Sequence, residues 1–285
     1  RDPQGCLLKI KRTVGMKDKD SFSVNIAGRW KEDILSMDIL DAGSWLGKSS
    51  DFPLMEEGTP ELISGIHSAM GIREALISHW ADGRYSPDES NSILLESLSG
   101  RENWHGIITA LPLTAGDSGN GLNRKLFGSK KVAGARIYPA TFRHSPSCWC
   151  IGPLCEILSE RKMPLFIFHT EASFDDLHNI AVNFPALKII VETQPKKIIY
   201  HSRSLLPLMK KCRNILADIS NLTAPGLLEL FVENIGCGRL IFSSFLPAND
   251  PLVPAGILIG SRIGQKEKVS IAGDNMRRIL EGIKK

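Results

Sequence analysis

Met163-Pro-Leu-Phe-Ile-Phe-His169 is a nearly continuous run of apolar residues that ends in a polar one. The same form returns at residues 187–192, 214–219 and 239–243. Strands of a parallel sheet have this pattern because helices cover both of their faces. Segments of helical length separate the runs, so the second half of the chain predicts a parallel sheet whose strands are joined by helices.

Four similar segments precede these runs, at residues 39–46, 74–79, 106–111 and 133–138. Eight strand segments alternating with helices predict an α/β protein with the (β/α)8 TIM-barrel fold. Such a barrel needs about 250 residues, so we expect a single domain over residues 38–285.

Three helix starts support the alternation. Thr59 and Ser86 each precede a proline, and Ser173 precedes an acidic first turn. Ser and Thr cap the first turn of a helix, proline suits the position after the cap, and acidic residues there favour the helix dipole. We therefore expect helices to begin at these three residues.

Residues 1–37 carry several lysines and arginines and little periodicity. We interpret them as an N-terminal extension before the first barrel strand. The expected form is a solvated surface segment.

Composition excludes several classes of protein. The chain has 285 residues, 42% of them hydrophobic, and its formal net charge of +4 is spread along the sequence. We expect a globular protein that binds neither nucleic acid nor membrane, because no basic patch and no apolar run of roughly 18 residues is present. Six cysteines without a regular framework suit a reducing compartment, so we expect a cytoplasmic location.

Five segments resemble, in chain order, the landmarks of the amidohydrolase-related barrel family, the branch that includes aminocarboxymuconate-semialdehyde decarboxylase and lactone hydrolases. Leu40–Gly47 is similar to the first-strand motif Asp-x-His-x-His-x-Gly, and Met163–Thr170 to a strand that ends in His-Thr. Phe184–Glu192, Leu240–Pro247 and Ile271–Leu280 resemble the sixth strand, the eighth strand and the closing helix.

The resemblance implies a divalent metal at the carboxyl ends of the strands, held by three histidines and an aspartate. At those positions this chain has Gly43, Trp45, His169 and Phe245, and the family's sixth-strand histidine, an acid or base, is replaced by Glu192. Such ligands suit zinc-like ions that activate water. Because His169 alone is kept, we expect a degenerate metal site and no metal cofactor.

Two other groups of residues offer metal ligands. His79, His169 and Glu192 would form a rebuilt zinc set, whereas in the alternative His79 bonds a backbone carbonyl and His169 is a core histidine. His144, Cys148, Cys150 and Cys155 lie within one short segment after the fourth strand. Their spacing is not a usual zinc pattern, and buried free thiols are the alternative.

We expect His169, Glu192 and Asp218 to be the catalytic residues of a metal-independent site. Glu192 in a dry barrel end would have a raised pKa or pair with His169, and either suits acid/base work. The structural alternatives are a hydrogen bond from Glu192 to Thr170 or Gln194, and Asp218 capping the loop that follows it.

We expect Arg136, Tyr138, His79 and Trp45 to bind substrate. An inward arginine would hold an anionic substrate through two hydrogen bonds. The alternative is that Arg136 pairs with Glu192 inside the barrel.

Two functions follow from this reading. In the first, the chain is a metal-independent hydrolase or lyase acting on a small carboxylated or lactone compound. In the second, it is a catalytically inactive homologue that serves as a binding or assembly subunit, and in both we expect a homo-oligomer. The two differ in whether His169, Glu192 and Arg136 meet at an open cavity or are covered by Trp45 and Phe245.

Overall fold

The computed structural model describes residues 31–49, 51–52, 55–82, 86–112, 126–194 and 201–284. Within them, eight parallel strands form one sheet in which every strand lies beside its neighbour in sequence. The strands are β1 (Leu40–Leu46), β2 (Glu74–His79), β3 (Trp104–Thr109), β4 (Val132–Arg136), β5 (Leu165–Phe168), β6 (Ile189–Glu192), β7 (Ile215–Asp218) and β8 (Leu240–Ile241).

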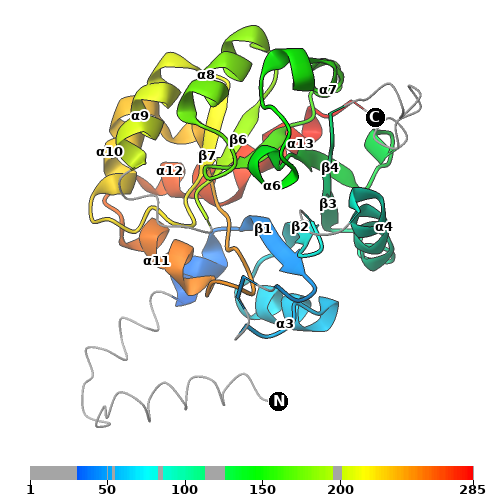
Figure 1. The fold of residues 1–285 in the computed structure, drawn as a ribbon. Helices are drawn as coiled ribbons and strands as arrows, with labels where there is room; N and C mark the ends of the chain where they lie inside the picture. Colours follow the sequence, from blue (N-terminus) through cyan, green and yellow to red (C-terminus); the bar gives the residue numbers. More distant parts are fainter. Residues whose placement is uncertain are drawn as a thin grey trace, which may run out of the picture.

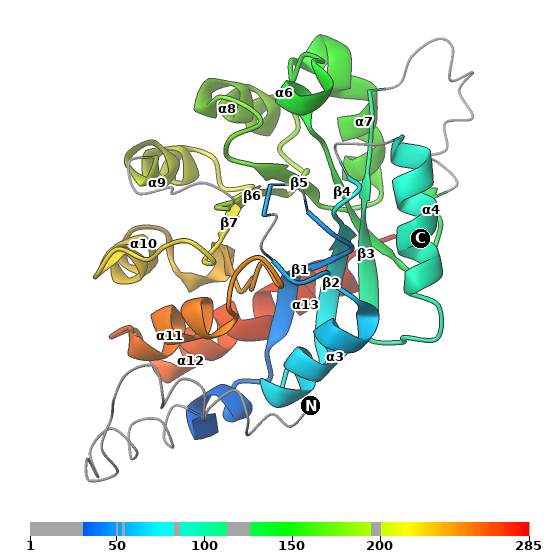
Figure 2. The same cartoon turned by 60° about the horizontal axis from the view of Figure 1, so that its bottom comes forward.

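Most of the helices lie outside the strands and cover their outer face (Figures 1 and 2). The helices of the described residues are α3 (Pro60–Ala69), α4 (Pro87–Ser97), α6 (Pro139–Phe142), α7 (Cys148–Glu160), α8 (Phe174–Asn183), α9 (Ser202–Lys211), α10 (Leu227–Ile235), α11 (Leu252–Gly260), α12 (Gln265–Val269) and α13 (Asn275–Glu281). The predicted (β/α)8 barrel is confirmed.

The sheet curves round so that β8 meets β1. The Ala42 amide donates to the carbonyl of Phe242 (3.0 Å), and the Trp45 amide donates to that of Leu246 (2.8 Å). These bonds bring the segment after β8 against the first strand, which turns the sheet into a barrel.

The predicted strands are all present, with shifted ends. The third strand, Trp104–Thr109, lies two residues earlier than predicted, the fourth, Val132–Arg136, begins one residue and ends two residues earlier, and the eighth is reduced to Leu240–Ile241. Predicted runs extend too far because residues beyond the last strand pair stay buried in the barrel mouth and therefore stay apolar.

Two predicted helix caps behave as expected. The Thr59 hydroxyl accepts from the Leu62 amide (3.1 Å), and Ser173 forms a capping box with Asp176. Ser86 precedes α4 but makes no capping hydrogen bond with its side chain. No helix in the described segments is both long and apolar enough to cross a membrane.

The barrel interior is layered. Near the strand starts an aliphatic layer, which includes Leu40, Phe166 and Leu216, packs on Met276 and Ile279 of α13. Above it lie buried polar side chains, and an aromatic cluster occupies the carboxyl ends of the strands. Since barrel active sites are built at the carboxyl ends, this last layer decides what the protein can do.

The described part of the predicted extension packs onto the barrel. Residues 31–36 are helical, and Ile34 and Met37 join the main hydrophobic core. Asp38, at the predicted boundary, pairs with Arg277 of α13 (3.3 Å). The rest of the extension lies outside the described residues.

Candidate functional site

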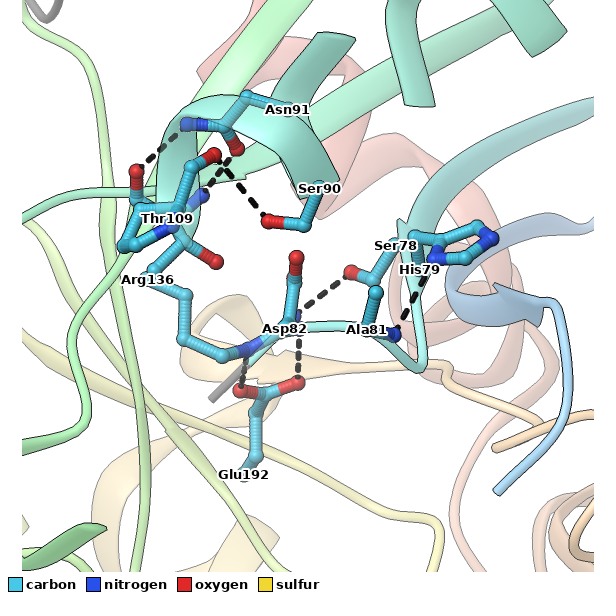
Figure 3. A network of polar contacts seen from close by, with 10 residues as sticks. Ser78, His79, Ala81, Asp82, Ser90, Asn91, Thr109, Arg136 and Glu192 are labelled. Atoms are coloured by element: carbon cyan, nitrogen blue, oxygen red, sulfur yellow. Dashed lines mark hydrogen bonds and ion pairs between the residues drawn. The ribbon is translucent and has the colours of Figure 1, made fainter. Parts of the chain in front are cut away.

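The centre of the barrel mouth holds a buried ion pair between Arg136 of β4 and Glu192 of β6 (Figure 3). Nε and Nη2 of Arg136 each donate to a different oxygen of Glu192 at 2.7 Å, and Nη1 donates to Ser78 Oγ at 2.7 Å. Arg136 is fully buried, and its carboxylate partner is nearly so. The arginine is paired inside the barrel, as the alternative interpretation had it, and its strongest donors are not available to a substrate.

An aromatic roof covers this pair. It consists of Trp45, Trp80, Tyr138, Phe168 and Phe245, all of them buried. The Arg136 guanidinium carbon lies 4.3 Å from the ring centre of Trp45, and the Trp45 ring stacks on Trp80 at 4.5 Å. A cation held against an indole face is stabilised by the ring's quadrupole, so the roof and the ion pair support each other.

Asp82, which follows β2, completes the charged centre and was not foreseen. Its Oδ2 lies 3.7 Å from Arg136 Nη1, and its side chain is fully buried. Burial raises the pKa of Asp82 to about 6, although Arg136 and the Thr109 and Ser90 hydroxyls favour the charged form. Its position after the end of a barrel strand is the sequence signal that would have identified it.

Several buried polar atoms in and around the mouth lack a partner in strict hydrogen-bond geometry, although the Thr109 and Ser90 hydroxyls lie close enough to Asp82 to favour its charged form. In the part of the chain that the structure describes, these orphan atoms are Trp45 Nε1, Trp80 Nε1, both Asp82 carboxylate oxygens, Thr109 Oγ1, His144 Nε2 and Asn249 Nδ2. Each buried orphan costs about 1–3 kcal/mol. Most of them lie in Trp45, Trp80, Asp82 and Thr109, at the carboxyl ends of three adjacent strands.

His169 pairs with a histidine that the sequence did not point to. Its Nδ1 lies 2.8 Å from Nδ1 of His201, the exposed residue just before α9. Arg136 donates to both oxygens of Glu192, and His169 and Glu192 are joined by a backbone hydrogen bond (3.1 Å). The pairing of their side chains stays a prediction. The Glu192 bonds to Thr170 or Gln194 also stay predictions.

Asp218 ends β7 and is buried. Its Oδ1 accepts from the amides and hydroxyls of both Thr193 and Ser220 at 2.5–3.2 Å. Burial, together with the charge of Glu192, raises its pKa to about 7 despite these bonds. The bonds from Ser220 show that Asp218 caps the loop that follows β7, as the structural alternative predicted.

His79 and Tyr138 lie where predicted, at the ends of β2 and β4, but neither faces a described cavity. His79 Nδ1 accepts from the Ala81 amide (3.1 Å). The alternative, in which His79 bonds a backbone carbonyl, stays a prediction. Burial lowers the pKa of His79 and raises that of Tyr138.

Asp41, Ser44 and His67 form a second buried network that the sequence analysis missed. Nε2 of His67 lies 2.8 Å from Ser44 Oγ and 3.5 Å from Asp41 Oδ2, and Ser44 donates to the same Asp41 oxygen. Desolvation opposes ionisation of Asp41, but His67, Ser244 and Ser44 outweigh it and lower its pKa. In a catalytic triad the acid and the serine bind opposite nitrogens of the histidine, whereas here both face Nε2, so the network is structural.

The sequence contained a signal for this network. His67 follows Ile63 by four residues on α3, and both are buried. A shared buried face at that spacing places the imidazole against the barrel.

The cysteines of residues 144–155 are free thiols, the interpretation preferred over a metal site. Cys148, Cys150 and Cys155 of α7 are free, and Cys155 is buried with a pKa raised by burial to about 12. No group of three or more His, Cys, Asp or Glu side chains among the described residues is arranged to hold a metal ion. The rebuilt set of His79, His169 and Glu192 is therefore not assembled either.

A shallow cavity of about 370 Å³ lies beside the mouth, between α6 and the start of α8. Its polar lining includes His144, Glu171 and Asp176. None of the predicted catalytic residues lines it.

Comparisons with known proteins agree with this architecture. The sequence matches no protein-family model, and it matches no curated protein sequence. Solved structures of similar fold include an uncharacterized TIM-barrel protein from Bordetella bronchiseptica (12% identity, 91% of each chain covered, TM-score 0.65). The chain shares its fold.

Two further neighbours have described activities or ligands. One is 2,6-dihydroxybenzoate decarboxylase from Rhizobium (13% identity, 85% of this chain and 98% of that one covered, TM-score 0.63). The other is an amidohydrolase from Burkholderia multivorans with bound zinc (12% identity, 85% and 99% covered, TM-score 0.66). At such low identities, the structural similarity establishes the barrel fold only. The chemistry has to be argued from the residues of the site.

The residues present do not fit the metal that the fold resemblance implies. Gly43 and Phe245 offer no ligand atom, and a Cβ at Gly43 would collide with Ser243 Oγ. Trp45 places an indole face where a first-strand histidine is expected, and that face already holds the Arg136 cation. Glu192, the carboxylate that replaces the family's sixth-strand histidine, is already bound to Arg136.

Proposed function

We propose that this chain is an amidohydrolase-type barrel that has lost its metal centre and its catalysis and serves as a binding or assembly subunit. The observation that carries the proposal is the paired, roofed Arg136. Its guanidinium is bound to Glu192 on one side and stacked against Trp45 on the other, in the centre of the barrel mouth.

The free energy of the buried ion pair favours the state in which Arg136 stays bound to Glu192. Removing either partner of a buried ion pair leaves an uncompensated charge, which costs about 3–5 kcal/mol. A substrate that drew Arg136 away from Glu192 would have to offset a cost of this size. An enzyme that opened this pair in every turnover would be slow.

Metal content and activity together test the proposal. Protein purified without chelator is incubated with excess zinc, manganese or iron, dialysed, and assayed by plasma mass spectrometry and with activated lactones, esters and hydroxybenzoates. The expected result is metal near zero and no turnover above a His169→Ala control. One equivalent of tightly bound metal that the His169→Ala variant loses would overturn it.

The second candidate is a metal-independent hydrolase or lyase that works on the other side of the mouth. The observation in its favour is Asp218, whose pKa is raised by burial to about 7, a value suited to a general base. His169, paired with exposed His201, lies at the end of β5, two strands away. In this case lactone hydrolysis would rise with pH through about 7, and the Asp218→Asn variant would abolish it.

We further propose a homo-oligomer in a reducing, cytoplasmic setting. The five described cysteines are all free, and an interface between copies could bury Trp149 of α7, which is 80% exposed. Light scattering after size exclusion tests the oligomer. A monomer at all concentrations would contradict it.

A further inference from the structure

The outer face of helix α11, formed by Leu252, Val253, Gly256 and Gly260, carries no polar side chain. Leu252 and Val253 are 49% and 38% exposed, and Gly260 is exposed as well. The helix lies on the outside of the barrel, drawn in orange in Figures 1 and 2. A surface helix ordinarily carries charged and polar residues on its outer face, so an apolar outer face is typical of a contact surface.

The inner side of α11 accounts for its packing on the barrel. Pro254, Ala255 and Leu258 are the buried residues of this helix. The neighbouring helix α10 also buries apolar residues, but it carries the exposed Glu233 on its outer side. The packing of α11 on the barrel therefore does not use its apolar outer face.

Opposite charges lie just beyond the two ends of α11. Asp250 is exposed, and its Oδ1 accepts from the Leu252 amide (2.8 Å). The Arg262 side chain is 87% exposed and lies 3.8 Å from the Glu229 carboxylate. Gly256 is midway between the two charges in the sequence. Two copies of α11 packed antiparallel about a two-fold axis at Gly256 would therefore bring Asp250 of each copy to Arg262 of the other.

The shapes of the side chains fit the same alignment. It places the exposed Leu252 of one copy opposite Gly260 of the other, because Gly256 is midway between these two residues as well. A Cβ at Gly260 would meet no atom within 4 Å, so the space beside it is open to a side chain from outside. At the axis, Gly256 would meet its own copy, and residues without side chains let two helices approach closely.

We propose that the outer face of α11 binds the same face of a second copy of this chain, with the two helices antiparallel about an axis at Gly256. Both members of each ion pair come from this chain, which favours a second copy over residues 1–30 or a different protein. The inference rests on the homo-oligomer proposed above and assigns a surface to it.

The contact is a small one. A helix of nine residues is about 14 Å long, so its contact lies at the low end of specific interfaces, below about 1,200 Å² in total. We therefore expect a reversible dimer that forms at micromolar or higher protein concentrations.

Reversal of the charges tests the alignment in the whole chain. Asp250→Arg and Arg262→Asp each convert both ion pairs into like-charge contacts, so each variant alone should dimerise about tenfold more weakly than wild type at low ionic strength. An equimolar mixture of the two variants should recover the dimer, because each variant then meets the opposite charge at both pairs. Sedimentation equilibrium from micromolar to submillimolar protein measures the association.

Gly260→Leu tests the fit of Leu252. This variant fills the space opposite Leu252 and should abolish the dimer, although it adds apolar surface. Gly65→Leu is the matched control, since Gly65 of α3 is also exposed with no atom within 4 Å of a Cβ, and it should dimerise like wild type.

A wild-type protein that stays monomeric would overturn the proposal, and this is the result expected if residues 1–30 or a different protein cover α11. A mixture no more associated than its two components, or a Gly260→Leu variant that dimerises as well as wild type, would also overturn it. A dimer that none of these variants weakens would contradict the α11 contact and leave the proposed homo-oligomer standing on another surface.

Discussion

At the scale of single residues, Arg136 determines the state of the barrel mouth. It is fully buried, bound to Glu192 through two 2.7 Å hydrogen bonds, and stacked against Trp45. Its charge therefore belongs to the interior of the folded protein and not to a binding surface.

Replacing one partner of this pair should lower the free energy of unfolding more than replacing both. We expect Arg136→Met to destabilise the protein by about 3–5 kcal/mol, because Glu192 is left as an uncompensated buried charge. The Arg136→Met, Glu192→Leu double variant should recover most of that loss, since well-packed apolar residues often replace a buried pair without cost. Urea denaturation of the three proteins measures the coupling, and additive losses would contradict a pair of this kind.

Asp218 should make stability depend on pH. Its pKa is raised to about 7 in the folded chain and is about 3.9 in an unfolded one, so the folded state holds the extra proton between these values. Its contribution is therefore complete below pH 4 and is lost as the pH rises to 7, by up to a few kcal/mol. Asp218→Asn keeps an oxygen for the Thr193 and Ser220 donors and should gain stability over the wild type across this range.

The measurement is the difference in unfolding free energy between Asp218→Asn and wild type from pH 4 to pH 8. Taking the difference removes the contributions of other groups, including His79, whose lowered pKa acts with the opposite sign. A difference that does not change with pH would show that the Asp218 pKa is not raised.

At the scale of the elements, capping of α8 offers a matched comparison. Ser173 forms a capping box with Asp176, whereas Ser86 precedes α4 without a capping bond from its side chain. Ser173→Ala should cost about 1 kcal/mol, and Ser86→Ala clearly less. Thermal melts of the two variants compare them, and equal losses would show that the capping box contributes nothing.

Strand β1 passes too close to the segment after β8 for a side chain at position 43. A Cβ at Gly43 would overlap Ser243 Oγ, so Gly43→Ala should destabilise the protein by about 1–3 kcal/mol. Adding Ser243→Ala removes the overlapping oxygen and should restore much of the loss. Unfolding experiments on the single and double variants test this, and no recovery in the double variant would place the strain elsewhere.

The elements were predictable because each has a local signal. Buried strands such as Leu165–Phe168 are apolar on both faces, and the prolines after Thr59 and Ser86 indicate where helices begin. The strand ends were not predictable, since a buried mouth keeps residues such as Ile137 apolar beyond the last strand pair.

At the scale of the whole molecule, closure of the barrel depends on Asp41. Its carboxylate accepts from the amide and hydroxyl of Ser244, after β8, and from the amide of Gly43 and hydroxyl of Ser44, within β1. The first and last strands are thereby joined by one buried side chain.

Asp41→Asn should therefore destabilise the whole fold, by at least about 2 kcal/mol, because hydrogen bonds to a charged group contribute about 1.5–3 kcal/mol each. Since the pKa of Asp41 is lowered, the wild-type protein should lose this contribution only as the pH falls below the unfolded value of about 3.9. The variant should lack that acid-induced loss. The test is the free energy of unfolding of both proteins, measured as the pH is lowered. An equal acid-induced loss in wild type and in Asp41→Asn would contradict the prediction.

The site was predictable only in part, because its contacts join distant parts of the chain. The sequence identified the positions of His169, Glu192 and Arg136 at strand ends, and it offered the Arg136–Glu192 pair as one alternative. It gave no signal for His201, because the contact joins residues 32 positions apart that no local pattern relates. The choice between a substrate arginine and a structural one needed the geometry of the Trp45 ring above it.

The stacked indoles of Trp45 and Trp80 also give the protein an optical property. Two chromophores with ring centres 4.5 Å apart and planes 26° from parallel share their excited states, so they should absorb left- and right-handed light unequally as a coupled pair. Any molecule that enters the mouth between them must separate the rings and diminish that near-ultraviolet circular dichroism. The circular dichroism of this tryptophan pair therefore reports whether the two rings are stacked, with the mouth closed, or separated, with the mouth open.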